Sequence, residues 1–301
     1  MSRRAERDVA FHYDVSNEFY ALFLDPRMVY TCAYYRRPDA GLATAQEDKL
    51  ELVCRKLQLA PGERLLDLGC GWGALALWAA ERWGVEVHGV TLSAAQATWA
   101  AEAARRAGLA GRVRIERADW RDVAPEKPYD KIAAIGLIEH VGRARHPAYF
   151  AQVHRLLTPG GLFLNHGITC RAGARRTSEM AFLQRHVFPG GELAPLDAIV
   201  GGIERAGFEI VDVEDLRPHY ARTTRQWVER LQANAERARA LVGERVYRTY
   251  LAYLAGASVA FDEGWIALHQ VVATRRGAVR TPATREAVYA LPWRTTVDRA
   301  S

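Results

Sequence analysis

The sequence predicts an α/β protein built on a doubly wound, mostly parallel sheet, and three observations support this. From Pro61 to Thr169, strand-like apolar runs alternate with helix-like runs, which is typical of a parallel sheet with helices on both faces. The first run, Glu63–Leu68, leads into a glycine-rich turn and then into strong helix formers. Polar residues follow the ends of the expected strands, where ligands bind in such sheets.

The chain before the sheet is expected to form an N-terminal helical cap, residues 1–60. Ser16 precedes an apolar run and is expected to cap a short helix that ends at Asp25-Pro26. The aromatic segment 28–35 follows. A Thr with a Glu three residues later has the form of a capping box and predicts a helix over about 44–59.

The sheet and its helices are expected within residues 61–275. A second capping box, Ser93-Ala94-Ala95-Gln96, predicts the start of a helix that ends near Gly108. The predicted strands are 63–68, 85–92, 113–118, 129–138 and 162–169, and the predicted helices between them are 74–80, 94–108 and 149–157.

The alternation is interrupted after the fifth strand. Residues rich in Arg and Phe follow, so we expect cover insertions over the sheet at about 171–200 and 217–260. The second insertion is expected to contain one or two long helices. A helix at 199–206, strands at 208–216 and 265–273, and a polar surface tail at 276–301 complete the prediction.

The glycine turn indicates a nucleotide-like ligand. Gly69, Gly71 and Gly73 alternate, and glycine lets the backbone approach a ligand without a Cβ in the way. A dinucleotide site would need an acidic residue at the end of the second strand, but Glu86 lies inside that strand. Asp67 inside the first strand, followed by G-x-G-x-G, resembles motif I of class I S-adenosylmethionine (SAM) methyltransferases. We therefore expect SAM rather than NAD.

The composition limits the compartment and the partners. The net charge is +6 and the pI about 9.2, which suits anionic partners such as phospholipid surfaces, acidic carrier proteins or nucleic acid. The four cysteines show no C-x-x-C spacing, so we expect free thiols and no metal site. The sequence shows neither a leader-like segment nor a run of about 18 apolar residues. We expect a cytoplasmic protein, with peripheral binding at the inner membrane face as an option.

Eight short stretches follow one another in an order found in one family. They are His12–Asn17, Tyr30–Tyr34, Asp67–Gly73, Val90–Ser93, Gly136–Gly142, His166–Ile168, Phe188–Gly190 and Tyr220–Thr223. Together they resemble the cyclopropane fatty acid synthase family, which includes the mycolic acid cyclopropane synthases. The resemblance covers about residues 10 to 275 and implies the Rossmann-like fold of class I methyltransferases.

The resemblance implies a set of SAM contacts. Gln96 also belongs to a capping box, and Trp120 also suits core packing, although a flat apolar ring fits an adenine face. Asp67, Gly73 and Asp119 join the set because they lie in the glycine turn or at a strand end. The positions implied by the family are Tyr30, Thr31, Gly69, Gly71, Thr91, Leu92, Gln96 and Trp120.

The resemblance also implies a bicarbonate ion that acts as the base. An alkene that attacks a sulfonium methyl leaves a carbocation, and a proton must leave before a three-membered ring can close. Glu139 and Tyr220 would hold the ion and stabilise the cation, and the aromatic rings of Tyr13 and Tyr34 would face the cation. Taken singly, a buried thiol, a core histidine or a helix-capping carboxylate also explains these positions. The implied holders are Cys32, Glu139, His166, the Ile168 backbone and Tyr220.

The expected function is that of a SAM-dependent C-methyltransferase. It would add the methyl(ene) carbon across the double bond of an unsaturated fatty acyl chain, as cyclopropane-fatty-acyl-phospholipid synthase does. The substrate would be an acyl lipid or an acyl carrier. Asn165-His166-Gly167 and Leu137-Ile138 depart from the well-known members, and we expect no counterpart of the extra N-terminal domain of the bacterial phospholipid enzymes. The acyl chain, the headgroup, a cyclopropane or a methyl-branched product, and the oligomeric state, including a dimer, stay open.

Three other functions compete with this one. Small-molecule N-methyltransferases similar to coclaurine N-methyltransferase show E-x-x-E-H, but Gly136 replaces the first carboxylate here, which disfavours a cationic amine. Amino-methylating DNA enzymes show Pro-Pro-Tyr after the fourth strand, and this chain lacks it, so we expect no nucleic-acid partner. An NAD-linked oxidoreductase is disfavoured by the missing acidic residue at the end of the second strand.

Overall fold

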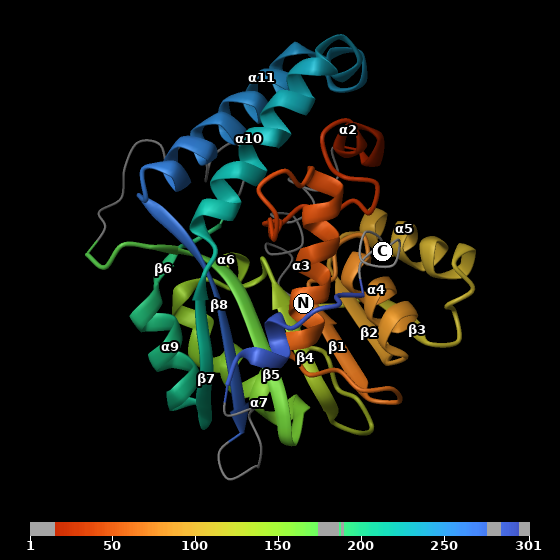
Figure 1. Ribbon diagram of the computed structural model, residues 1–301, viewed down its shortest axis with the longest axis vertical. Coiled ribbons are helices and arrows are strands. Elements are labelled where there is room, and N and C mark those ends of the chain that lie inside the picture. The colour runs from red at the N-terminus through yellow and green to blue at the C-terminus, as the bar shows by residue number, and fades with distance from the viewer. Residues whose placement is uncertain (1–15, 174–186, 188–189, 276–283, 295–301) are drawn as a thin grey trace.

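The computed structural model describes residues 16–173, 187, 190–275 and 284–294. Within these residues the sheet has eight strands in the order β3-β2-β1-β4-β5-β8-β7, with the short β6 paired to β5 (Figure 1). Strand β8 is antiparallel to both of its neighbours, and the other pairs are parallel. The predicted mostly parallel sheet is therefore confirmed. The strands are β1 Arg64–Leu68, β2 Glu86–Thr91, β3 Val113–Arg117, β4 Tyr129–Ile135, β5 Leu157–Cys170, β6 Ala194–Pro195, β7 Phe208–Asp215 and β8 Ile266–Arg275.

Helices cover both faces of the sheet, and a helical hairpin lies beyond its carboxyl edge (Figure 1). Apolar side chains of α3 and α4 pack on one face, and those of α7 and α9 on the other. The hairpin of α10 and α11 packs with α2 and the loop after it into a third apolar cluster. The helices are α2 Asn17–Ala21, α3 Leu42–Lys56, α4 Ala74–Trp83, α5 Ala94–Arg106, α6 Ile138–Val141, α7 His146–Leu156, α9 Leu196–Arg205, α10 Arg217–Ala233, α11 Ala235–Asp262 and α12 Glu286–Tyr289, with a 3-10 turn at Arg143–Arg145.

Two predicted helix caps are confirmed and one is wrong. The Ser16 hydroxyl accepts a hydrogen bond from the Phe19 backbone N–H at 3.0 Å, and the Ser93 hydroxyl accepts one from the Gln96 backbone N–H at 3.2 Å. Helix α3, however, begins at Leu42 rather than Thr44, because the Gly41 carbonyl already accepts from the helix backbone. The threonine therefore lies inside the first turn and caps nothing.

Two predicted strand boundaries are also wrong. Strand β4 ends at Ile135 instead of residue 138, because Gly136 takes a φ of 68° and the chain turns into α6. Strand β5 begins at Leu157 rather than residue 162, since Leu157 already pairs with Tyr129 before the register shifts. Gly160, with a φ of 83°, accommodates this irregularity.

Most residues in the described part of the tail, 284–294, are exposed on the surface, but Trp293 is an exception. The Trp293 side chain is only 2% exposed. The Arg55 guanidinium donates to the carbonyls of Ala290 and Pro292, both at 2.6 Å, and lies over the indole ring. This segment is therefore attached to α3.

The strand register gathers the predicted site at one edge of the sheet. Leu68 of β1 pairs with Ala134 of β4, and Ile135 pairs with His166 of β5. The residues that follow these pairs are the glycine turn, the turn into α6 and the end of β5. All three segments therefore meet at the carboxyl edge, as expected for a ligand site in such a sheet.

Candidate active site

The glycine turn after β1 is shaped differently at each of its glycines. All three have positive φ, at 80° for Gly69, 54° for Gly71 and 84° for Gly73. A Cβ on Gly71 would meet only the Gln96 side-chain nitrogen, at 4.0 Å, whereas a Cβ on Gly73 would lie 2.9 Å from the Cβ of Ala100. Gly71 thus leaves open space at the site, while Gly73 allows α4 and α5 to pack closely.

Asp67 lies at the floor of this turn with one oxygen uncommitted. Its carboxylate is buried, and Oδ2 has no hydrogen-bond partner among the described residues. Burial raises the pKa of Asp67 to about 7, and the positive charge of Lys49 opposes that rise. A buried carboxylate oxygen without a donor fits a cationic or N–H donor on a ligand.

The end of β2 fixes the Gln96 side chain. The Thr91 hydroxyl donates to Gln96 Oε1 at 2.8 Å, so the side chain does not return to its own N-cap backbone as a complete capping box requires. The Leu92 carbonyl accepts from Arg117 at 3.2 Å. Gln96 therefore presents its amide nitrogen toward Gly71.

Asp119 and Trp120 follow β3. Burial raises the pKa of Asp119, but hydrogen bonds from Arg121 outweigh it and hold the pKa below its ordinary value. The carboxylate accepts from the Arg121 backbone at 3.0 Å and from its guanidinium at 2.7 Å. The Trp120 ring meets Tyr149 edge to face, with centroids 5.3 Å apart, and stays half-buried. This position of the Trp120 ring is compatible with both roles, packing in the core and contact with the face of an adenine ring.

The loop 28–35 lies over the same edge. The Thr31 carbonyl accepts from Gln46 at 2.9 Å, and its hydroxyl accepts from the Lys49 ammonium at 3.1 Å. A Cβ on Gly136 would lie 3.2 Å from the Thr31 methyl. The ring of Tyr30 packs against aromatic rings of α2 and α10. Thr31 is therefore held between α3 and the end of β4.

The Glu139 side chain contacts the last part of β5. Its Oε1 accepts from the Ile168 backbone N–H at 2.6 Å, and Oε2 is buried without a partner among the described residues. Burial raises the pKa of Glu139 to about 7, although the hydrogen bond from Ile168 opposes this. Near neutral pH this group can therefore both hold and release a proton.

His166 is buried on β5 and stays neutral. The Gln270 amide on β8 donates to Nδ1 at 3.1 Å, while Nε2 has no partner within the described part of the chain. Burial, aided by the charges of Lys49 and Lys56, lowers the pKa of His166 well below its ordinary value. Because Nδ1 accepts, the proton lies on Nε2, which is a free donor.

The Cys32 thiol and the Tyr220 backbone N–H share one hydrogen-bond acceptor, the Leu216 carbonyl. The Leu216 oxygen lies 3.8 Å from the Cys32 sulfur and accepts from the Tyr220 backbone N–H at 3.1 Å. Burial raises the pKa of Cys32 well above its ordinary value, so it is a thiol. Tyr220 stacks on Phe261 with centroids 4.4 Å apart. The Ile168 side chain packs against the cluster that contains both residues, which links them to the Glu139 side of the site.

Some functional candidates lacked any signal in the sequence. Lys49 looks like one more lysine on an amphipathic helix, and Gln270 like one more strand residue.

Burial raises the pKa values of Tyr149 and Tyr253, and the negative charge of Glu139 raises them further. For Tyr253 a hydrogen bond with Tyr30 partly offsets the rise. These phenols therefore lie near that carboxylate.

Other expectations fall elsewhere. The Tyr34 ring contacts the rings of His219 and Trp293, with centroids 4.7 and 5.9 Å away. Tyr13, with the rest of the stretch up to residue 15, and the cover residues Phe182–Phe188, apart from Val187, lie outside the described residues.

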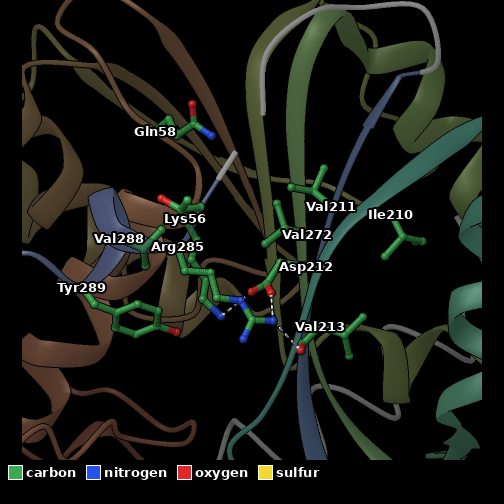
Figure 2. A pocket seen from close by; sticks show the side chains of 11 residues that line it. Lys56, Gln58, Ile210, Val211, Asp212, Val213, Val272, Arg285, Val288 and Tyr289 are labelled. Carbon is green, nitrogen blue, oxygen red and sulfur yellow. Dashed lines mark hydrogen bonds and ion pairs between the residues drawn. The ribbon is translucent and has the colours of Figure 1, made fainter. Parts of the chain in front are cut away.

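A pocket of about 480 Å³ lies apart from these residues, between α3, β7 and the C-terminal segment (Figure 2). Figure 2 shows Arg285 reaching Asp212, with which it forms an ion pair. Lys56 lies 3.4 Å from the same carboxylate. None of the predicted site residues lines this pocket, and its charges pair with one another. It therefore has no evident part in the chemistry.

Comparisons with known proteins agree on one family. A family model described as mycolic acid cyclopropane synthetase matches residues 1–271. A probable fatty acid methyltransferase of Pseudomonas putida is 44% identical over 289 residues, covering 93% of this chain and 73% of that protein. Cyclopropane mycolic acid synthase 1 of Mycobacterium tuberculosis is 38% identical over 274 residues, covering 87% of this chain and 95% of that protein.

Solved structures show the same likeness. The cyclopropane synthase MmaA2 from Mycobacterium tuberculosis superposes with a TM-score of 0.85 at 36% identity, covering 90% of this chain and 98% of that one. Mycolic acid cyclopropane synthase CmaA1, solved with S-adenosylhomocysteine (SAH) and CTAB, gives 0.85 at 37% identity with the same coverage. Coclaurine N-methyltransferase, at 24% identity and a TM-score of 0.75, shares the fold alone.

Proposed function

Because this chain belongs to the mycolic acid cyclopropane synthetase family, and is therefore a SAM-dependent methyltransferase of unsaturated fatty acyl chains, we propose that carbon transfer takes place beside Glu139 and His166. The observation that carries this proposal is a pair of buried, uncommitted polar atoms, Glu139 Oε2 and His166 Nε2. Both belong to segments that meet at the carboxyl edge of the sheet.

The neighbouring groups fit SAM. Asp67 Oδ2 offers an acceptor for an ammonium group, and Gly71 leaves space where a side chain would otherwise stand. When bound, SAM supplies an electrophilic methyl carbon. The residues that we propose to hold it are Tyr30, Thr31, Asp67, Gly69, Gly71, Gly73, Thr91, Leu92, Gln96, Asp119 and Trp120.

We also propose that a bicarbonate ion is held by Cys32, Glu139, His166, the Ile168 backbone and Tyr220. His166 contributes a neutral N–H donor, which does not compete for protons. Glu139, with a pKa of about 7, can donate a hydrogen bond when protonated. These groups fit a small oxyanion, which would supply a base for the proton lost before ring closure.

The surroundings of Glu139 favour a developing positive charge. When ionised, its carboxylate attracts a cation in a site of low dielectric. Burial also keeps water away from a cation that water would quench.

The substrate is proposed to be an acyl lipid or an acyl carrier reached at an anionic surface. The net charge of +6 suits such a surface. No helix of the described residues is both long and apolar enough to cross a membrane. Binding to vesicles that contain anionic lipid is expected to weaken as salt rises, because surface charges are screened. Equal binding to neutral and anionic vesicles would count against this part.

The reaction itself is tested in a host supplied with methyl-labelled methionine. Mass spectrometry of the lipids is expected to show unsaturated chains that gain one labelled carbon and lose the olefin. A host that expresses Glu139→Gln serves as the matched control and should show the olefins unchanged. Label on amines, hydroxyls or nucleic acid, with the olefins untouched, would refute the assignment.

A further inference from the structure

Helix α3 holds the active-site loop through three positions within about one turn, Ala45, Gln46 and Lys49. The Ala45 carbonyl accepts from the Tyr34 backbone at 2.9 Å, Gln46 donates to the Thr31 carbonyl at 2.9 Å, and Lys49 donates to the Thr31 hydroxyl at 3.1 Å. Lys49 is only 2% exposed. A lysine is seldom fully buried unless it is paired, so this one needs an explanation.

The direction of the Lys49 hydrogen bond fixes the hydroxyl of Thr31. An ammonium group has three donors and no acceptor, so the Thr31 oxygen must accept from Lys49. The hydroxyl proton then points away from Lys49. It remains available to an acceptor on the other side, such as the carboxylate of an amino-acid ligand.

Lys49 also balances the charge beneath the glycine turn. Burial lowers the pKa of Lys49 to about 8, and the charges of Asp25, Cys32, Asp67 and Cys54 oppose this. Asp25 already accepts from the backbone N–H groups of Arg27 and Val29, and the two thiols are neutral at physiological pH. Asp67 is thus the acidic group that retains an uncommitted oxygen. The charges of Lys49 and Asp67 attract each other, while Asp67 Oδ2 stays uncommitted among the described residues.

We propose that Lys49 is a positioning residue for the amino-acid part of the cofactor, because it orients the Thr31 hydroxyl and counterbalances Asp67 from beneath the glycine turn. The inference rests on the proposed cofactor site. It adds a residue that acts through its hydrogen bond to Thr31.

The chain offers a matched control on the same helix. Lys56 lies two turns further along α3, is 4% exposed, and pairs with Asp212 and Glu214 of β7. Lys56 and Asp212 line the pocket of Figure 2, apart from the loop 28–35. Lys56→Met therefore removes a buried lysine of the same kind without touching Thr31.

The test is calorimetric titration of SAH into the wild type, Lys49→Met, Lys56→Met, Thr31→Val and the double variant Lys49→Met/Thr31→Val, with thermal unfolding of each protein. Removing a hydrogen bond to a charged group should weaken SAH binding at least about tenfold in Lys49→Met. Lys56→Met should stay within about twofold of the wild type while losing thermal stability. The double variant should bind no more weakly than the weaker single variant, because both changes remove the same interaction.

The outcomes separate two errors. Wild-type affinity in Lys49→Met, an equal loss in Lys56→Met, or fully additive losses in the double variant would each overturn the role of Lys49. If Lys49→Met fails to fold, Lys49→Gln replaces it in the titration, since glutamine removes the positive charge but is more easily buried; wild-type SAH affinity in Lys49→Gln would also overturn the role of Lys49. A wild type that does not bind SAH would instead refute the proposed cofactor site.

Discussion

Two neighbouring glycines of the same turn should fail in different ways when each becomes alanine. Gly71 and Gly73 both have positive φ, at 54° and 84°. A Cβ on Gly71 meets nothing closer than 4.0 Å, but a Cβ on Gly73 lies 2.9 Å from Ala100. Gly71→Ala should therefore fold and lose the cofactor, whereas Gly73→Ala should mainly lose stability.

The magnitudes follow from these contacts. A left-handed conformation costs an L-residue about 1–2 kcal/mol, and this applies to both variants. Overpacking against Ala100 adds about 1–3 kcal/mol for Gly73→Ala alone. The free energy of unfolding should thus fall by about 1–2 kcal/mol in Gly71→Ala and by about 2–5 kcal/mol in Gly73→Ala.

Urea unfolding and calorimetric titration of SAH measure the two effects. Gly71→Ala should bind SAH at least about tenfold more weakly, since a methyl group in the ligand's path costs at least about 1.4 kcal/mol. If a folded Gly71→Ala variant bound SAH with wild-type affinity, the open space beside Gly71 would not be part of the ligand site. Equal free energies of unfolding in the two variants would show that a Cβ on Gly73 does not overpack against Ala100.

Three further outcomes are expected. Glu139→Gln should lower turnover at least about a hundredfold and leave SAH affinity within about twofold; an equal loss of both would place Glu139 in the cofactor site instead. Burial raises the folded-state pKa values of Asp67 and Glu139 to about 7, so the unfolded chain releases these protons at lower pH than the folded chain. The free energy of unfolding should therefore fall as pH rises from about 4 to 7. Urea unfolding should show a steeper fall for the wild type than for Asp67→Asn. Trp293→Ala should lower the free energy of unfolding by about 3–5 kcal/mol, because Trp293 is only 2% exposed. The control Trp265→Ala removes a ring that is 56% exposed and should change the free energy of unfolding by about 0.5 kcal/mol or less. Similar losses in both variants would contradict the packing of the C-terminal segment.

The features that the sequence predicted well are those coded by neighbouring residues. Ser16 and Ser93 act on backbone groups three residues away, and the glycines after Asp67 change direction within the same turn. The alternation of strands and helices is equally local. Such signals survive in the fold because tertiary packing agrees with them.

The features that were missed depend on partners far away in the chain. Strand β5 starts early because Leu157 pairs with Tyr129. Trp293 is covered by Arg36 and by Arg55 of α3, which lie over its ring. Gln270 matters through His166, more than a hundred residues earlier. Nothing within a short window distinguishes these residues from ordinary surface or strand residues.

The uncommitted oxygen of Asp67 links ligand binding to pH. In the free protein its pKa is about 7, so the carboxyl is mostly protonated at pH 6 and mostly ionised at pH 8. A cationic ammonium group binds the ionised form, and binding therefore releases a proton where the carboxyl was protonated. SAH should bind more tightly at pH 8 than at pH 6, and titrations at pH 6.5 in buffers of different ionisation enthalpy should report the released proton. Asp67→Asn should remove both the pH dependence and the proton release. An unchanged pH dependence in that variant would assign the titration to another group.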